Sequence, residues 1–440
     1  MSKKDHANTD FSILGLDIKG ISRDSFYKTL LVLTCFSVFT KIAVLFVTPN
    51  FFGSFVDLFD ISYYFNWAVP TLSGQLPYID YTVDYPILVL IPVLLPLPFA
   101  VLANDGMMYV YVYQFIMSVF DLLTLYCVYL IGLKLYDHKK AFFAGIFYST
   151  AFAASYFVLT KYDAFPTFWM MLAIMLMIYN KKLPGYIGIT LGFFTKIFPI
   201  IALPYMMIQN SSKSNIKAEM IDFLKCALPI GIILFIPLFI LAPQTINAYL
   251  FATGVKTSDV YVNTLTYTLH SLLELCNISV SLNTLSLLMY ILMIFSVLTL
   301  LLAALVTRIG SDRRMIMYTL FTIFIIITCT KFHSPQYIVW MTPLFAILLA
   351  DLVYGSLLFY LIQVFAYIEF PLLFNKLYVN LEYLNQFGTP GWMTIVMFFA
   401  LEYIIWIGTI IYLLYNDIEL KEQFKTLPSN LLRLFLSKDN

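Results

Sequence analysis

"LPGYIGITLGFFTKIFPIIALPYMMIQ", residues 183–209, decides how this chain is threaded through a membrane. The stretch is long enough for one span, but such a span would hold Lys196 at its middle. A lysine at that depth costs about 2.5–3.5 kcal/mol on insertion. Two short helices that meet at Thr195 and Lys196 avoid this cost. We therefore expect the chain to turn there and to leave Lys196 at a membrane surface.

The composition of the whole chain is that of a membrane protein. Of 440 residues, 61% are hydrophobic and 12% are charged, whereas soluble domains carry roughly 25% charged residues. Apolar runs of about 20 residues, the length that crosses a bilayer, recur along the sequence. The net charge of +1 argues against a nucleic acid partner. The five cysteines stand singly, without metal-ligand spacing, so neither a disulfide framework nor a bound metal is expected.

A second ambiguous stretch, "PILVLIPVLLPLPFAVLA" (86–103), contains four prolines. Each proline removes a backbone donor that lipid cannot replace, so we expect this segment to dip into the outer face without crossing. Both choices gather the lysine and arginine clusters near 134–140, 181–182, 213–217 and 308–314 on one side, which the positive-inside rule makes cytoplasmic. The opposite choices would move two of these clusters outside.

This threading predicts an all-α polytopic protein with about twelve membrane helices. The expected helices are 28–48, 107–135, 139–159, 163–180, 184–196, 197–209, 219–242, 283–306, 314–331, 335–351, 353–374 and 391–415. Segments 1–27 and 416–440 are then cytoplasmic ends, the first without the features of a signal peptide. The membrane domain is 28–415, with outer loops at 49–106, 243–282 and 375–390. Within the bundle, Asp121 is expected to form a hydrogen bond, with Lys41 as one candidate partner.

The first outer loop holds the most unusual composition. "VDLFDISYYFNWAVPTLSGQLPYIDYTVDYP" (56–86) has four aspartates, many aromatic residues and no lysine or arginine. Its first part suits a helix lying in the membrane interface, where aromatic rings concentrate. On such a helix Asp57, Asp60 and Tyr64 share one face. The plainer alternative is that these aspartates are ordinary solvated charges of an outer loop.

The outer cations fall in short polar junctions between apolar helices. They are Lys161 in "LTKYDAFPT", Lys196 in "FFTKIFP", Lys256 in "TGVKTSD" and Lys331, followed by His333, in "CTKFHSPQYIVW". Isolated lysines on the side where lysine is depleted favour binding of an anion such as phosphate. The alternative is that each lysine only marks a helix end, with its ammonium reaching the interface. A carboxylate opposite such cations suits group transfer from a lipid phosphate, with aspartate accepting a proton.

Taken in order, these motifs resemble the GT-C glycosyltransferases. Within them the chain is most similar to the polyprenyl-phosphate-mannose-dependent mannosyltransferases that build phosphatidylinositol mannosides and related glycolipids. The residues that carry the resemblance are "DISYY" with Asp60 and Tyr64, "SGQLPYIDYTVDYP", "KYDAFPT", "TKIFP" and "KFHSPQYIVWMTP". The chain departs from the family's pattern where Pro86 is followed by Ile87, and where 243–282 lacks the usual Arg-Gly and Glu-Ser pairs.

The resemblance implies a GT-C-type bundle, an inverting reaction and no metal or other cofactor. The implied donor is a polyprenyl or dolichyl monophosphate sugar, and the acceptor is a glycolipid or glycan hydroxyl on the outer face of the plasma membrane. Asp60 would be the catalytic base, and Lys331 and His333 would lie near the donor phosphate, with Lys196 and Lys256 added on charge. The expected substrate-binding residues are Asp57, Tyr64, Asp84, Tyr85, Lys161, Tyr162, Asp163, Gln336 and Tyr337.

Two other classes of function stay open at this point. A lipid or solute transporter could also have twelve spans, although the polar residues singled out above cluster at one surface and no internal repeat is evident. A family member without catalytic activity, acting as an assembly subunit, would fit the missing motifs of the 243–282 loop.

Overall fold

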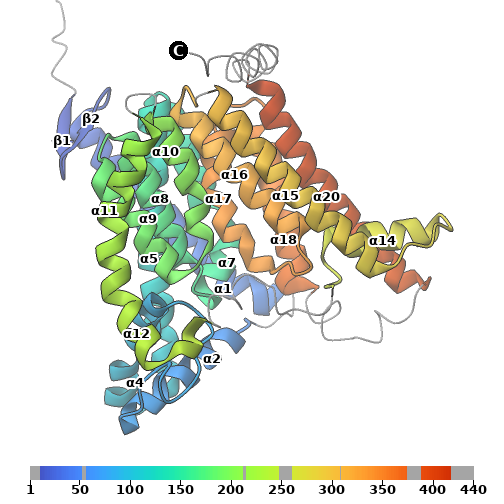
Figure 1. Cartoon of the computed structure of the whole chain (residues 1–440), viewed down its shortest axis with the longest axis horizontal. Coiled ribbons are helices and arrows are strands. Elements are labelled where there is room, and N and C mark those ends of the chain that lie inside the picture. Colours follow the sequence, from blue (N-terminus) through green and yellow to red (C-terminus); the bar gives the residue numbers. More distant parts are fainter. Residues whose placement is uncertain are drawn as a thin grey trace, which may run out of the picture.

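A computed structural model describes residues 10–51, 56–211, 215–246, 260–307, 309–373 and 388–417. Apart from one small hairpin, these residues form helices joined by short connections, as in an all-α multi-pass membrane protein (Figure 1). Six of the described helices are long and apolar enough to cross a membrane. A seventh span results if α6 and α7, which meet at a bend of 52°, are taken as one. The expected number of twelve stays a prediction.

The first half of the chain contains the hairpin, the short helices of residues 59–103 and a layer of packed helices. Its elements are β1 (Phe11–Ile13), β2 (Leu16–Ile18), α1 (Arg23–Phe51), α2 (Phe59–Ala68), η1 (Val69–Ser73), η2 (Ile87–Val89), α3 (Leu90–Leu94), α4 (Leu97–Ala103), α5 (Gly106–Leu135), α6 (His138–Ser149), α7 (Phe152–Thr160), α8 (Ala164–Ile178), α9 (Lys182–Thr195), η3 (Phe198–Ala202), α10 (Leu203–Ser211), α11 (Ile216–Leu234), α12 (Ile236–Leu241) and η4 (Pro243–Thr245).

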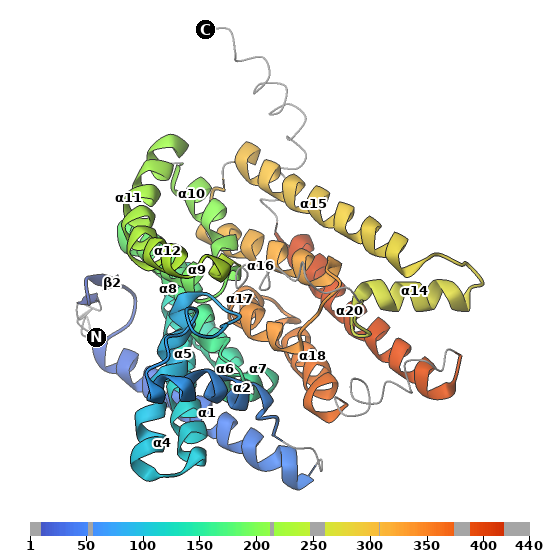
Figure 2. The same ribbon diagram turned by 60° about the horizontal axis from the view of Figure 1, so that its bottom comes forward.

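The second half packs against this layer. Its elements are α14 (Leu265–Leu275), α15 (Leu282–Thr307), α16 (Asp312–Cys329), η5 (Pro335–Tyr337), α17 (Ile338–Leu349), α18 (Gly355–Tyr367), the short π-helix η6 (Ile368–Leu372) and α20 (Pro390–Asn416). Figure 2 shows α14 between α15 and α20, with which it makes contacts. Helix α17 lies at the centre, in contact with α5, α6, α7, α8, α16 and α18.

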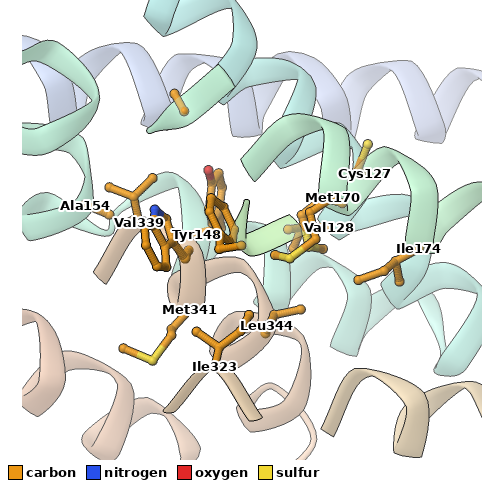
Figure 3. Close-up of a cluster of buried hydrophobic side chains, with 14 of the residues drawn as sticks. Cys127, Val128, Tyr148, Ala154, Met170, Ile174, Ile323, Val339, Met341 and Leu344 are labelled. Carbon is orange, nitrogen blue, oxygen red and sulfur yellow. The ribbon is translucent and has the colours of Figure 1, made fainter. Parts of the chain in front are cut away.

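The core is apolar and lies where α5, α8 and α17 meet. Figure 3 shows side chains from these helices gathered there with others from α6, α7 and α16; the labelled residues are Cys127, Val128, Tyr148, Ala154, Met170, Ile174, Ile323, Val339, Met341 and Leu344. Each of these side chains is almost wholly buried. One polar group inside this part of the bundle is fully paired: Asp121 binds the Lys41 ammonium at 2.5 Å and accepts a hydrogen bond from the Tyr148 hydroxyl at 2.6 Å, which confirms the expected partner.

The two segments that decided the threading fold as expected at their breaks. Helix α9 ends at Thr195, Lys196 is extended, and the chain continues as η3 and α10. Residues 87–103 form η2, α3 and α4 in succession, an apolar helical stretch shorter than the six long helices; that it dips into the outer face without crossing stays a prediction. In Figure 1, α2 and α4 lie at the lower end, and the C-terminal end of α20 lies at the upper end with the β1–β2 hairpin.

Contacts between helix ends that are distant in sequence agree with the predicted threading, which assigns each end to one of two sides. At ends expected in the cytoplasm, Arg313 pairs with Asp417 at 3.3 Å and Lys140 pairs with Asp351 at 2.5 Å. At the other end, the Gln244 side chain donates to the Tyr78 carbonyl at 2.8 Å. The contacts therefore join the ends that the prediction assigns to one side. Which end faces the cytoplasm stays a prediction.

The N-terminal segment differs from the expected polar leader. Within residues 10–27, β1 and β2 pair antiparallel, and Leu14 and Gly15 form the turn with positive φ angles of 50° and 75°. Two such residues in succession are typical of a tight hairpin turn. The alternation in "FSILGLDI" buries Leu16 and Ile18, and helix α1 begins at Arg23, earlier than expected. Residues 1–9 and most of the C-terminal segment, 418–440, lie outside the described residues.

Candidate active site

Helix α2 brings Asp60 and its neighbours to one face, as the spacing predicts. Asp57 precedes the helix and accepts a hydrogen bond from the Phe59 amide at 3.0 Å, which fixes the start of the first turn. Asp60 lies in that turn. One turn later, the Tyr64 hydroxyl points back to Asp60 Oδ2 at 3.4 Å. The predicted helix is therefore formed, although it begins at Phe59 and excludes Asp57, and its place in the membrane interface stays a prediction.

Lys161 binds both aspartates. Its ammonium lies 2.9 Å from Asp57 Oδ2 and 3.1 Å from Asp60 Oδ1. The side chains of Lys161 and Asp57 are each 8% exposed and that of Asp60 is 22% exposed. Breaking a buried pair by removing one partner costs about 3–5 kcal/mol, because a buried charge is left alone. The lysine thus holds the Asp60 carboxylate in place and leaves it partly open to a ligand.

The surroundings of Asp60 change its acidity. Burial raises the pKa of Asp60 above its ordinary value, because the charged form loses its hydration. The ammonium of Lys161 opposes this effect, and the charges of Asp57 and Asp163 add to it. A carboxylate with a raised pKa is a better proton acceptor than an ordinary aspartate.

A second lysine–aspartate pair stands at the break after α9. The Lys196 ammonium lies 2.7 Å from Asp163 Oδ1, and both side chains are buried. The same carboxylate oxygen accepts a hydrogen bond from the indole of Trp340 at 2.5 Å. The Lys196 ammonium also lies 4.7 Å from the ring centre of Tyr162 and 5.0 Å from that of Trp340, distances typical of cation–π contacts.

The tripeptide Lys161-Tyr162-Asp163 joins the two pairs. It connects α7 to α8, so that Lys161 binds Asp60 while Asp163 binds Lys196. Between them, the Tyr162 ring lies 5.9 Å from Tyr64, edge to face. The electrostatic effect of Asp163 on Asp60 also indicates that the two pairs are neighbours. Residues from four separate stretches of sequence therefore form one site.

Asp84 and Tyr85 lie at the edge of this site. Asp84 accepts a hydrogen bond from the Tyr63 hydroxyl at 2.6 Å, so α2 holds this carboxylate. The Tyr85 ring lies 4.8 Å from Tyr162 and 5.6 Å from the Lys196 ammonium. Asp80, by contrast, is exposed and accepts a hydrogen bond from the amide of Leu76 within its own turn.

Lys331 and His333 lie between α16 and η5; His333 reaches the site through Tyr337, whereas the contact that the structure gives Lys331 is made by its backbone. The His333 ring is stacked at 6.3 Å on Tyr337, whose own ring lies 4.0 Å from Trp340. The Lys331 carbonyl accepts a hydrogen bond from the Tyr261 amide at 3.0 Å. Among the described lysines that are expected on the outer side, Lys331 differs from Lys161 and Lys196, because no carboxylate of the described residues lies within ion-pair distance of it.

The hydrogen bond of His333 to Tyr403 determines which ring nitrogen carries the proton when the ring is neutral. The Tyr403 hydroxyl donates its one proton to the Asn263 carbonyl at 2.8 Å, so at 3.1 Å it must accept from His333 Nδ1. The other ring nitrogen, Nε2, then carries no proton in neutral histidine. Burial also lowers the pKa of His333 to about 4. His333, expected near the donor phosphate, is thus a neutral imidazole near pH 7, and hydrogen bonding to a phosphate through Nε2 would require it to take up a proton.

Three further expectations concern neighbouring positions. Gln336 is buried in η5, next to Tyr337, whose ring centre lies 5.9 Å from the Lys196 ammonium. Lys256 lies in 251–259, outside the described residues. Within the parts of the chain that the structure describes, no three His, Cys, Asp or Glu side chains are placed to hold a metal ion.

Several residues of the site were missed from the sequence. Trp340 stands inside the quoted "KFHSPQYIVWMTP" stretch, where an indole N–H close in sequence to Lys331 and His333 was a usable signal. Tyr113 of α5 and the pair Asn263 and Tyr403 gave no such signal, because each looks like an ordinary member of an apolar or polar run.

The chain was compared with known proteins. No protein-family model and no curated protein matches it. Among solved structures it is similar to the archaeal oligosaccharyltransferase AglB from Archaeoglobus fulgidus, in complex with an inhibitory peptide and a dolichol-phosphate, with a TM-score of 0.44 and 14% sequence identity over 89% of this chain and 56% of the other. Structures of that enzyme in the apo form and tethered to an acceptor peptide give TM-scores of 0.43 and 0.44. The chain thus spans little more than half the length of AglB, and similarity at this level carries no information on its reaction or substrates.

Proposed function

We propose that this chain is an inverting glycosyltransferase of the GT-C type. It moves a hexose, with mannose as the leading candidate, from a polyprenyl or dolichyl monophosphate sugar to a hydroxyl of a glycolipid or glycan at the outer face of the plasma membrane. The observation that carries the proposal is the Lys161-Tyr162-Asp163 tripeptide, which sets the Asp60 pair and the Lys196 pair on two sides of one aromatic site. The resemblance of the motifs to the mannosyltransferase family supplies the substrate class.

The reaction assigns a separate role to each pair. The acceptor hydroxyl gives its proton to the Asp60 carboxylate, and its oxygen forms a bond to C1 of the hexose from the side opposite the phosphate. The bond between C1 and the phosphate oxygen breaks, and its electron pair leaves with the lipid phosphate. Lys196 has three N–H donors, of which Asp163 engages one. Lys196 and Lys331, which has no ion-pair partner among the described residues, are therefore the candidates that stabilise the charge gathering on the phosphate.

The test is direct transfer by the purified protein. Wild-type protein is incubated with polyprenyl-phosphate-mannose and a membrane glycolipid extract, and the lipids are analysed by mass spectrometry. A mass increase of one hexose on a lipid, absent without protein, supports the proposal and identifies the acceptor. A parallel incubation with polyprenyl-phosphate-glucose decides between hexoses. Accumulation of the lipid or a solute in sealed vesicles without a new glycosidic bond would favour a transporter instead.

A further inference from the structure

Helix α2 has a second face, to which the proposed reaction assigns no role. One face of the helix packs on the rest of the protein through Ile61, Tyr64 and Trp67. The opposite face is exposed, and its members are Phe59, Ser62, Tyr63 and Asn66. Residues three and four positions apart are neighbours on a helix surface, so these four side chains form one continuous strip, the exposed face of α2.

Two aromatic rings on this face are open to a ligand. The Phe59 side chain is 73% exposed and that of Tyr63 is 40% exposed. Their ring centres lie 6.5 Å apart, and the ring planes are within 7° of parallel. A ligand on this face therefore meets aromatic rings without displacing any part of the protein.

The exposed face of α2 lies beside two carboxylates. The Tyr63 hydroxyl donates to Asp84 Oδ2 at 2.6 Å, and the Asp60 side chain, in the preceding turn, is 22% exposed. Partial burial and then Asp84 raise the pKa of Tyr63 to about 12, and the charge of Asp60 acts in the same direction. Tyr63 is thus a neighbour of both carboxylates, and the exposed face begins next to the one that takes the proton in the proposed reaction.

The chemistry of the exposed face limits what could bind there. Residues 56–86 contain no lysine or arginine, so an anionic head group would meet Asp60 and Asp84 without a compensating cation. Lipid chains would bury the polar groups of Ser62, Asn66 and Asp84 without partners, which is costly. A carbohydrate suits the face, because its C–H surfaces pack on aromatic rings and its hydroxyls exchange hydrogen bonds with hydroxyl, amide and carboxylate groups.

The length of the face indicates how much carbohydrate it holds. Between Phe59 and Asn66 the helix rises about 10 Å, which is more than one hexose ring covers. We propose that the exposed face of α2, together with Asp84, binds the acceptor through a second sugar residue, next to the one whose hydroxyl reacts at Asp60. This inference rests on the proposed function and deepens it, because it makes the acceptor a glycan or glycolipid with at least two sugar residues.

The experiment compares Phe59→Leu and Asn66→Ala with Phe99→Leu. Phe99 is 49% exposed in α4, at the same end of the molecule as α2 (Figure 1), so this control removes a comparable ring away from the face. Leucine keeps an apolar side chain at position 59 but removes the ring. Binding of methyl mannoside and methyl mannobioside to each purified full-length variant is measured by saturation-transfer NMR, alongside the affinity for polyprenyl-phosphate-mannose and Tm.

The wild-type protein should bind the disaccharide more tightly than the monosaccharide. Phe59→Leu and Asn66→Ala should each weaken binding of the disaccharide about 3- to 10-fold, because each removes one exposed contact. Both variants should leave monosaccharide binding, donor affinity and Tm unchanged, since these side chains lie on the surface. Phe99→Leu should change none of the four quantities.

Equal binding of the two glycosides by the wild type, or binding of neither, would overturn the proposal. Weakening by Phe99→Leu as large as that by Phe59→Leu would also overturn it, because exposed rings would then act through contact with lipid. Failure of the proposed function gives a different result. Disaccharide binding that the two variants weaken would uphold the subsite even without hexose transfer, whereas transfer with an unchanged acceptor KM in both variants would remove the subsite alone.

Discussion

At the scale of single residues, burial and neighbouring charges change the pKa of Asp60 in opposite directions. Burial and the nearby charges of Asp57 and Asp163 raise its pKa, while the Lys161 ammonium, 3.1 Å away, lowers it. An aspartate acting as base must be ionised. Transfer should therefore be lost as the pH falls through the pKa of Asp60, and this loss should begin at a higher pH than for an ordinary aspartate.

Two substitutions next to Asp60 should move this pH dependence in opposite directions. Lys161→Met removes the opposing positive charge, so the pKa of Asp60 rises and the acid limb of kcat/KM moves to higher pH. Asp57→Asn removes a neighbouring negative charge, and Lys161 then pairs with Asp60 as its one remaining carboxylate of the two. The pKa of Asp60 should therefore fall, and the acid limb of kcat/KM should move to lower pH. The measurement is kcat/KM for hexose transfer against pH for both variants and the wild type. Two shifts in the same direction, or no shift, would show that another group limits the acid side.

The sequence carried much of this residue-level information. The order of "DISYY", "KYDAFPT" and "TKIFP" predicted that Asp60, Lys161, Asp163 and Lys196 share one side, and the structure brings them together. The sequence alone could not show which lysine pairs with which aspartate, because this pairing depends on how the helices cross. The tautomer of His333 was equally hidden, since it follows from a hydrogen bond to Tyr403, 70 residues away in the chain.

At the scale of elements, the break after α9 positions the Lys196 pair. Prediction of this break succeeded because a lysine in mid-membrane is costly, a physical penalty that can be read from one sequence. At the other breaks in the helices, no lysine or arginine in the sequence made a continuous span costly. The bend between α6 and α7 and the π-helix after α18 arise within apolar runs, so the sequence predicted single spans there.

Close packing at Gly192 holds the chain where it turns. A Cβ atom at Gly192 would lie 2.9 Å from Cβ of the rigid Pro199 ring, whereas a Cβ atom at Gly188, one turn earlier, would lie 3.4 Å from Cβ of Ala173. Gly192→Ala should therefore force α9 and η3 apart, at a cost of about 1–3 kcal/mol, and move Lys196. Gly188→Ala should be neutral or stabilising by up to about 1 kcal/mol.

Thermal unfolding in detergent checks this expectation. Tm of Gly192→Ala should fall relative to both the wild type and Gly188→Ala, and its hexose transfer should fall as well. Equal Tm values for the two alanine variants would contradict the tight contact between α9 and η3.

At the scale of the whole molecule, the contacts sort the helix ends into two groups. Arg313 with Asp417, and Lys140 with Asp351, join ends of one group. Asp57 with Lys161, and Lys196 with Asp163, join ends of the other. The distribution of lysine and arginine along the sequence predicted the same two groups of helix ends. Threading either ambiguous segment the other way would have moved a whole cluster of positive charges to the opposite side. This charge bias sets how the protein is oriented in the membrane.

Cys276 offers a test of that orientation in intact cells. It is exposed at the end of α14, in the loop expected outside, whereas the exposed Cys35 lies within α1, where lipid should shield it. A membrane-impermeant maleimide should label the wild-type protein on intact cells, and Cys276→Ser should lose this label. Labelling that requires permeabilised cells would place the loop, and with it the proposed site, on the cytoplasmic side.

The central claim is that the carboxylate of Asp60 accepts the proton of the acceptor hydroxyl beside a lipid-phosphate sugar. The most direct measurement is hexose transfer by purified Asp60→Asn, with Asp80→Asn as the matched control from the exposed part of the same loop, and with donor binding measured in parallel. We predict that Asp60→Asn binds polyprenyl-phosphate-mannose but transfers hexose slower by on the order of 10²- to 10⁴-fold, while Asp80→Asn keeps wild-type rates. Full transfer by Asp60→Asn would contradict the account.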